Sequence, residues 1–274
     1  MARSSVPSAT GDPTSRRWRC KSPLPMHIIR IVCLHRSRRL SAQRLVGIVV
    51  GRDDEKQTFW IQEAVLVSQS WVLSRKLRSS TDWYVCLAYP DDGVEAWEVL
   101  AFWMVTHSLP ECDFEDLKCA DSVTFQWMLM RYWILGERYM IEEFQDDIML
   151  ELLQVLKKYP IAVHAAEGAI RGSAPGLKLR LLAAKAIIFA VHWWRKAKVG
   201  DFAACEGVED YTSDLVTPMQ RYNQKFSRLP KGIKASKNWH LVAKDTGAWK
   251  EYLFNPGQTM LCVQESRSLR SLTL

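Results

Sequence analysis

The clearest pattern of apolar and polar positions lies between residues 131 and 158. Five apolar residues recur there at intervals of three and four, namely Ile141, Phe144, Ile148, Leu152 and Val155. The remaining side carries five acidic residues, namely Glu142, Glu143, Asp146, Asp147 and Glu151. This spacing is typical of a helix with one buried stripe and one solvated face. We therefore predict helices over 122–139 and 141–158, almost without a joint, the second ending at Pro160. The acidic face suits solvent and a helix N-terminus better than a divalent cation.

Upstream of these helices the pattern changes to short β-type runs. Residues 45–50 and 58–61 are apolar and β-branched, and the polar stretch 52–57 between them predicts a hairpin turn. A third run at 82–88 has the same character. Helical spacing returns at 63–77, as one or two short helices, and at 95–105. The order of these elements predicts an α+β fold in which helices cover a small sheet.

From residue 157 onward the sequence predicts a mainly helical extension over 157–222. Ser173 is a suitable N-cap, with Pro175 in the first turn, for a helix that runs to about Ala197. Its expected buried stripe excludes Lys178, Arg180 and Lys185 and consists of Leu177, Leu181, Ala184, Ile188 and Val191. A weaker helix covers about 208–222, and residues 223–274 are expected to form a mostly irregular basic tail.

The charge of the chain is concentrated at its start. The net charge is +7, but residues 1–44 contain ten of the 37 basic residues and one of the 30 acidic residues, so the rest carries −2. Residues 1–44 are therefore predicted to be a disordered basic arm, although an Arg- and Ser-rich segment also has the composition of a transit peptide. A nucleic-acid partner is expected only through this arm.

Candidate chemistry is sparse. The six histidines lie far from any hydrolase or metalloprotease motif, and no glycine-rich phosphate loop is present, so we predict no enzyme activity, no catalytic residues and no cofactor. The seven scattered cysteines favour reduced thiols, hence the cytoplasm or nucleus. The Cys/His group at 20, 27, 33 and 35 has no zinc spacing, so no metal site is expected. No membrane span is expected either.

Twelve tryptophans are unusual for 274 residues. Five of them fall at core positions of the expected helices, namely Trp97, Trp103, Trp127, Trp133 and one of Trp193 and Trp194. Core packing is therefore a better interpretation of them than an aromatic cage. Trp71 and Trp83 fit the core less well, and exposed tryptophans are typical of an interface.

Three blocks, placed in this order, resemble the BTB/POZ domain, in particular the short divergent BTB proteins of filamentous fungi. The first, 45–51 with 58–77, is similar to the family's first strands and the helical segment after them, and the second, 85–110, is similar to its third strand and following helix. The third, 130–153, is similar to its paired helices. Matching residues in the first two blocks are Phe59, Ile61, Leu66, Ser70, Leu77, Trp97, Phe102, Trp103, Thr106, Leu109 and Pro110. The resemblance implies a BTB-like domain over 45–156.

This resemblance implies a protein–protein interaction module that forms a homodimer. Its dimer surface would include Leu45, Ile48, Val50, Val65, Trp71, Leu73 and Leu77. A second surface, which some family members use to bind a cullin scaffold of a ubiquitin ligase, would include Trp103, Met104, His107 and Leu109. Two alternatives stay open: a nucleic-acid-associated regulator in which the basic arm binds and the BTB-like part dimerises, and a paralogue that no longer pairs.

Overall fold

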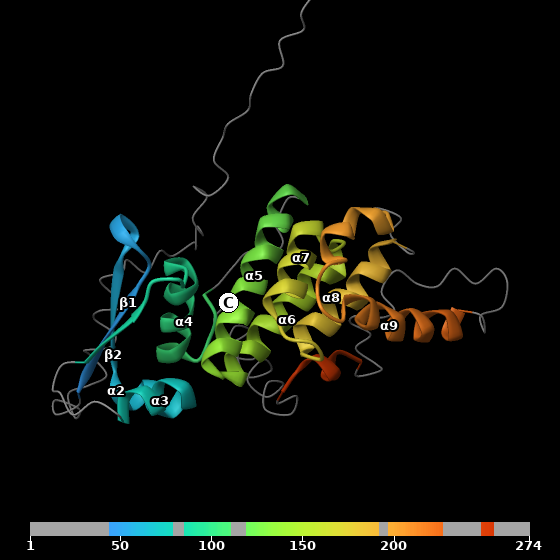
Figure 1. Cartoon of the computed structure of the whole chain (residues 1–274). Helices are drawn as coiled ribbons and strands as arrows, with labels where there is room; N and C mark the ends of the chain where they lie inside the picture. Colours follow the sequence, from blue (N-terminus) through green and yellow to red (C-terminus); the bar gives the residue numbers. More distant parts are fainter. Residues whose placement is uncertain (1–43, 79–84, 111–118, 192–196, 227–247, 255–274) are drawn as a thin grey trace, which may run out of the picture.

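The structure is a computed structural model, and it describes residues 44–78, 85–110, 119–191, 197–226 and 248–254. It is a mixed α+β fold, as the sequence predicts. The described residues from 44 to 110 form a sheet with helices, and we call them the sheet unit. The described residues from 119 to 254 are mainly helical, and we call them the helical unit. Figure 1 shows the two side by side, with α4 (Val94–Thr106) between the sheet and the helical unit.

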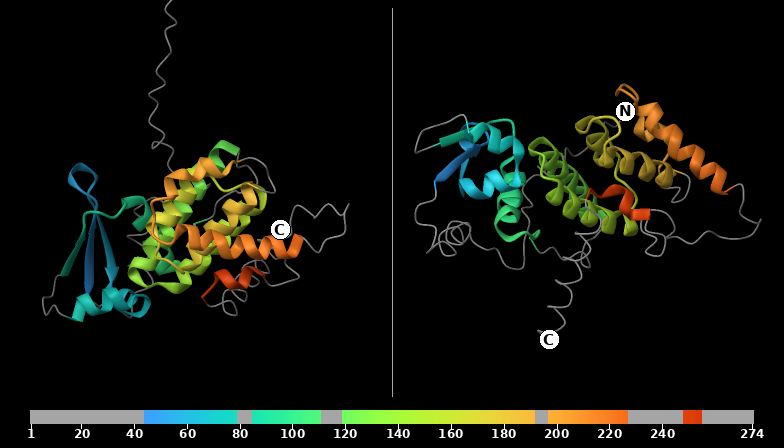
Figure 2. Two further views of the ribbon diagram at one scale, coloured as in Figure 1. Left: turned by 45° about the vertical axis from the view of Figure 1, so that its right-hand side comes forward. Right: turned by 90° about the horizontal axis from the view of Figure 1, so that it is seen from below.

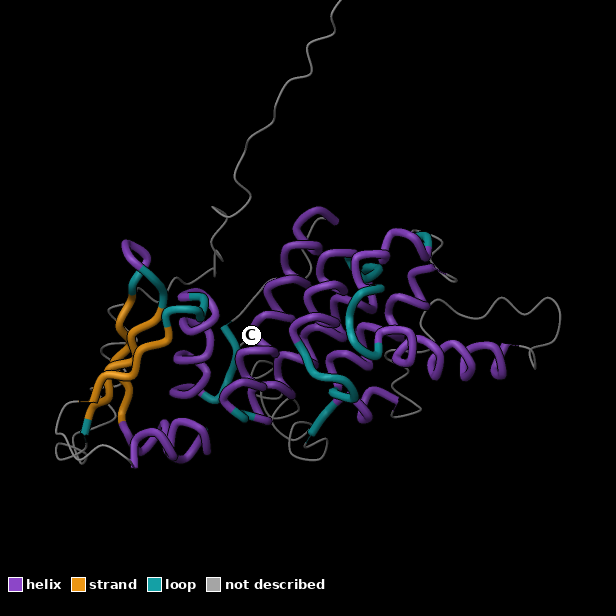
Figure 3. The backbone as a smooth tube through the Cα atoms, viewed as in Figure 1, coloured by secondary structure: helices purple, strands orange, loops and turns teal. Residues whose placement is uncertain are grey.

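The sheet has three strands in the order β2-β1-β3. β1 (Leu45–Val50) and β2 (Gln57–Gln62) pair antiparallel around a 3-10 turn, Asp53–Glu55, so the predicted hairpin is confirmed. β3 (Val85–Tyr89) lies parallel to β1. The predicted third strand is therefore present from residue 85, and its first residues, 82–84, lie outside the described part. Figure 3 shows the three strands together on one side of the molecule.

Strand alternation gives the sheet two unlike faces. The inner face is apolar and buried, with Val46, Ile48, Val50, Phe59 and Ile61 at most 4% exposed. The neighbouring helices are α2 (Glu63–Gln69), α3 (Trp71–Arg78) and α4, and they contribute Leu66, Leu73 and Trp97 to the same core. On the outer face the register places Gly47 between Trp60 and Cys86, both of which are exposed.

The predicted helix pair is confirmed as α5 (Cys119–Tyr139) and α6 (Glu142–Lys158). The joint is a tight turn in which Met140 has a φ of 54° and the Ile141 amide donates to the Gly136 carbonyl. The predicted apolar stripe of α6 is buried throughout. The predicted solvated face is wrong in part, because Asp146 is 1% exposed and Asp147 is partly buried.

The prediction for 173–197 is wrong in its start and its faces. Ser173 ends a helix, α7 (Val163–Gly172), and its hydroxyl donates to the Ala169 carbonyl at 2.6 Å. The following helix, α8 (Lys178–Phe189), is buried on most sides, and Arg180 lies inside at 2% exposure. α7 packs against α5, so the chain after residue 157 continues the helical unit. Residues 192–196, including Trp193 and Trp194, lie outside the described part.

The last helix and the tail also differ from expectation. α9 (Tyr211–Phe226) follows a 3-10 segment, η5 (Val199–Cys205), and extends four residues past the predicted end. Within the predicted irregular tail, η6 (Ala248–Tyr252) packs against α6 and α8, and Tyr252 and Leu253 are buried. Figure 2 shows η6 beside the helices rather than apart from them. Among the helices described, none has the length and apolar character needed to cross a membrane.

Candidate interaction surface

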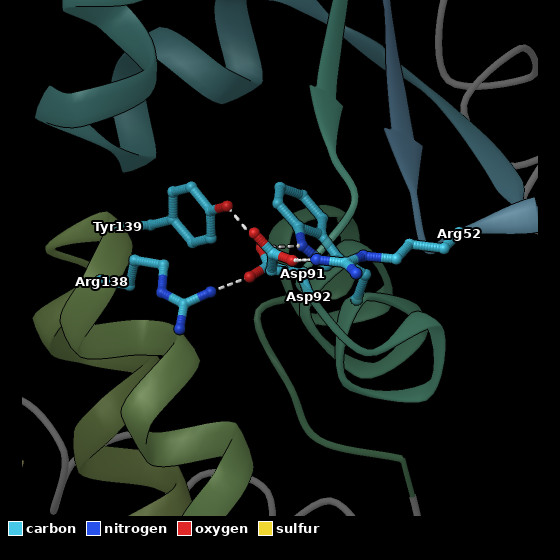
Figure 4. Close-up of polar contacts among 6 residues, drawn as sticks. Arg52, Asp91, Asp92, Arg138 and Tyr139 are labelled. Carbon is cyan, nitrogen blue, oxygen red and sulfur yellow. Dashed lines mark hydrogen bonds and ion pairs between the residues drawn. The ribbon is translucent and has the colours of Figure 1, made fainter. Parts of the chain in front are cut away.

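A buried carboxylate joins the sheet unit to the helical unit. Asp92, in the turn between β3 and α4, is 7% exposed. Its oxygens accept hydrogen bonds from the Trp97 indole nitrogen at 2.8 Å and the Tyr139 hydroxyl at 2.5 Å, and they pair with the Arg138 guanidinium. Figure 4 shows Arg138 and Tyr139 reaching Asp92 from the end of α5, while Arg52 pairs with Asp91 nearby. Charge-assisted bonds of this kind are stronger than neutral ones, so the turn and the helix end are held together.

Tyr139 is the centre of this junction. Its ring meets the rings of Trp97 and Tyr89 edge-on, with centroids 5.0 and 5.2 Å apart. Burial raises the pKa of its hydroxyl, which therefore stays protonated and donates to Asp92. Its backbone carbonyl accepts the Ser70 hydroxyl at 2.6 Å, and the Ser70 oxygen in turn accepts the Leu73 amide at 3.1 Å and so caps α3. Each of these groups has a partner within the chain, so the junction is structural.

An exposed apolar surface borders the junction. Trp71 and Met140 are the next residues after Ser70 and Tyr139, so both flank the same contact. Trp71 is 62% exposed and Met140 is 58% exposed, more than the other large apolar side chains that the structure describes. The Arg75 guanidinium lies 5.5 Å from the Trp71 ring and extends the surface. We call these three residues the Trp71 surface. Exposed aromatic and arginine side chains are the residues most enriched in binding hot spots.

The expected dimer residues divide between this exterior and the core. Ile48, Val50, Leu73 and Leu77 are at most 1% exposed and pack inside the chain, so their side chains do not face a partner here. The sequence pattern could not tell core residues from interface residues, because a buried face and a dimer surface are both apolar. Leu45 is 38% exposed, Val65 is partly buried and Trp71 is exposed, and these three stay available.

The second expected surface, at the end of α4, is also mostly interior. Trp103 and Met104 are each 1% exposed, and the Trp103 indole nitrogen donates to Asp147 of α6 at 2.7 Å. His107 is exposed and ends α4 with a φ of 51°, and Leu109 is partly buried. The α4 end therefore presents the imidazole of His107 and part of Leu109.

Asp147 has an unusual environment at this place. The pKa of its carboxyl is raised to about 6, mainly by burial and also by the neighbouring Asp146 and Glu143, against the Trp103 hydrogen bond and His107, which lower it. Protonation near neutral pH is thus coupled to the contact between α4 and α6. The described residues contain no group of three or more His, Cys, Asp or Glu that could hold a metal ion.

The sequence indicated part of this surface and missed the rest. Trp71 was expected at an interface, and Trp97, Trp103 and Trp133 were expected in the core, where they lie. Trp83 lies outside the described residues. Met140 was missed, because its exposure comes from the left-handed turn between two helices. A break between two helical patterns at residue 140 is the signal that could have found it.

Comparison with known proteins leaves the chain without an assigned family. No protein-family model matches it, and no curated protein sequence matches it.

Proposed function

We propose that this chain is a non-enzymatic protein–protein interaction module of BTB/POZ type, acting in the cytoplasm or nucleus, and that it pairs with a second copy of itself. The proposal rests on the resemblance of residues 45–51, 58–77, 85–110 and 130–153 to that family. The order of elements, two strands, paired short helices, a strand, a helix and paired long helices, supports it.

The observation that carries the proposed pairing is the Trp71 surface. Trp71 and Met140 are both more than half exposed, and each directly follows a residue of the Ser70–Tyr139 hydrogen bond. Exposed apolar side chains that border one contact are typical of an interaction site. Burial of both side chains against a second copy would remove this apolar area from water. Because the surface includes the tip of α3 and the α5–α6 turn, it joins both units, and a twofold arrangement would place two such surfaces face to face.

A cullin scaffold remains a further candidate partner in this proposal, but of the four residues expected to bind it only His107 and Leu109 are accessible. The pairing through Trp71 is therefore the function to test first. The nucleic-acid alternative depends on residues 1–44, nearly all of which lie outside the described part.

The test is light scattering after size exclusion on the full chain, over a range of concentrations and at two salt levels. We expect a dimer that persists at high salt, since apolar contacts are not screened. Trp71→Glu should weaken it by about 2 kcal/mol or more, roughly thirtyfold in Kd. Met219→Glu is the matched control, because Met219 on α9 is also exposed, at 43%, but lies away from this surface.

Two outcomes would refute the pairing. One is a wild-type chain that stays monomeric at every concentration. The other is an equal loss of dimer in the Trp71 and Met219 variants, with both folded by circular dichroism.

A further inference from the structure

The segment 248–254 packs against α5, α6 and α8, and we call the surface that it covers the groove. Tyr252 is fully buried and Leu253 is 2% exposed. The Phe254 ring stacks on Trp133 of α5, with centroids 6.4 Å apart and planes at 22°. Three adjacent side chains of this segment therefore pack into the core that α5, α6 and α8 form, although the segment belongs to none of these helices.

Polar contacts with the groove are distributed along the same short run. The Phe254 amide donates to an Asp146 carboxylate oxygen of α6 at 2.6 Å, and the Lys178 ammonium of α8 bonds the Leu253 carbonyl. Lys185, two turns further along α8, pairs with Glu251 at 2.5 Å. Main-chain bonds combined with side-chain pockets are the means by which proteins recognise short peptide segments.

Two cations also lie over the aromatic rings of the segment. The Lys178 nitrogen is 4.3 Å from the Phe254 centroid, and the Lys185 nitrogen is 5.0 Å from the Tyr252 centroid. Each lysine therefore contacts the segment twice, once through an oxygen and once through a ring. The Lys185 contacts favour an aromatic residue directly after an acidic one, and the Lys178 contacts favour a second aromatic residue, since its oxygen partner is a main-chain carbonyl.

The segment reaches this groove from a distance in sequence. Phe226 ends α9 and Ala248 begins the segment, so 21 residues separate them. The contacts with α5, α6 and α8 are made by residues 251–254 themselves, so a separate peptide of this sequence contains the groups that the groove bonds.

We propose that α5, α6 and α8 form a recognition groove for short peptide segments of the order acidic, aromatic, aliphatic, aromatic, and that Glu251-Tyr252-Leu253-Phe254 is its built-in ligand. A partner protein with an exposed segment of this class binds in place of the built-in one. The contacts of this groove involve none of Trp71, Arg75 and Met140, so the proposal does not depend on the pairing proposed above.

The test uses the full chain and a fluorescent, amidated peptide of residues 248–254. Amidation removes the terminal carboxylate that would otherwise lie beside Asp146. The chain variant Tyr252→Ala/Phe254→Ala weakens the built-in ligand and leaves Trp133, Asp146, Lys178 and Lys185 in place. We expect the peptide to bind this variant about tenfold or more tightly than the wild type, because a tethered ligand competes at an effective concentration of roughly millimolar.

Charge reversal tests whether a bound peptide places its acidic residue against Lys185, as Glu251 lies in the chain. In the background of that variant, Lys185→Glu should weaken the native peptide about threefold and restore binding of a peptide that carries Glu251→Lys. Lys157→Glu is the control, because it makes the same charge change at an exposed position of α6. It should leave both peptides unchanged.

Equal binding to the wild-type and weakened chains, or no binding to any folded variant, would overturn the proposal and make the segment a permanent part of the fold. If the double variant unfolds, the full chain with Glu251→Lys takes its place, since Glu251 is exposed. That chain should bind the native peptide more tightly than the wild type does, and equal binding would again overturn the proposal.

Discussion

The sheet unit and the helical unit bury their apolar side chains in different ways. The sheet unit buries one face of its sheet and leaves Trp60 and Trp71 exposed at its margin. The helical unit buries α8 on most sides and uses the short segment 248–254 to cover part of α6 and α8. The surface proposed for a partner thus lies on the sheet unit and the adjoining Met140, whereas the helical unit covers part of its own surface with a segment of the same chain.

The two units also bury charge for different purposes. Asp92 holds the two units together through donors from Trp97, Tyr139 and Arg138. Arg180 works within the helical unit, where it pairs with Asp214 of α9 and bonds the Glu209 carbonyl. A buried charge is tolerated only when it is paired, so each network shows where a long-range contact is essential.

The largest effect is expected inside the helical unit, at Arg180. Arg180→Ala leaves the Asp214 carboxylate without its cation and should lower the free energy of unfolding by about 3–5 kcal/mol. Urea denaturation measures this, and hydrogen exchange should show α9 losing protection before α5. Lys157→Ala on the exposed side of α6 is the control and should stay within about 0.5 kcal/mol of wild type. If Arg180→Ala lowers the free energy of unfolding by less than about 1 kcal/mol, the pair with Asp214 does not hold α9 in place.

The junction between the units comes next. Asp92→Ala removes the acceptor of the buried Trp97 and Tyr139 donors and should cost about 2–4 kcal/mol, by the same denaturation measurement. Asp92→Asn should cost less, because an amide oxygen still accepts. The matched control is Asp91→Ala, since the pair with Arg52 has both side chains roughly 70% exposed. Equal losses of stability in the Asp91 and Asp92 variants would show that Asp92 does not hold the two units together.

A glycine pair compares packing in the two units directly. A Cβ at Gly136 of α5 would lie 2.7 Å from the Cγ of Gln145, which is buried, so Gly136→Ala should cost about 1–3 kcal/mol despite its higher helix propensity. A Cβ at Gly47 would meet Cys86 at 3.0 Å and Trp60 at 3.2 Å, but both side chains are exposed and can move. Gly47→Ala should therefore cost less than about 1 kcal/mol in thermal unfolding. The reverse order would show that the outer sheet face is the more rigid.

The smallest effect concerns Asp147 and depends on pH. Its folded pKa of about 6 lies above its ordinary 3.8, so the folded chain binds this proton more tightly than the unfolded chain. The corresponding stability is present at low pH and is lost as the pH rises from about 4 to about 6. Asp147→Asn should remove this loss and raise stability near pH 7 by up to about 2 kcal/mol, with little change near pH 4.

Unfolding free energies measured from pH 4 to pH 8 would check this. Glu142→Gln, an exposed acid at the start of the same helix, should leave the pH curve of the wild type unchanged. The prediction is contradicted if the unfolding free energy of the Asp147 variant changes with pH in the same way as that of the wild type.

Much of the fold could be predicted where a pattern is local. The hairpin around 52–57 and the α6 stripe from Ile141 to Val155 follow from spacing alone, and both are confirmed. Ser173 shows the limit of local rules, because a serine hydroxyl serves the end of α7 as well as it would have served the start of a helix. At the candidate surface, Trp71 was predicted, but Leu73 and Leu77 on the same helix lie in the core.

The sequence by itself determined where most strands and helices lie, because periodicity and turn residues act over a few positions. Only the tertiary structure decided which of the expected surface residues are buried and which charges are interior. Arg180 and Asp146 could enter the core because Asp214 and the Phe254 amide, from distant parts of the chain, reach them there. Burial depends on neighbours that are remote in sequence, and no local pattern contains them.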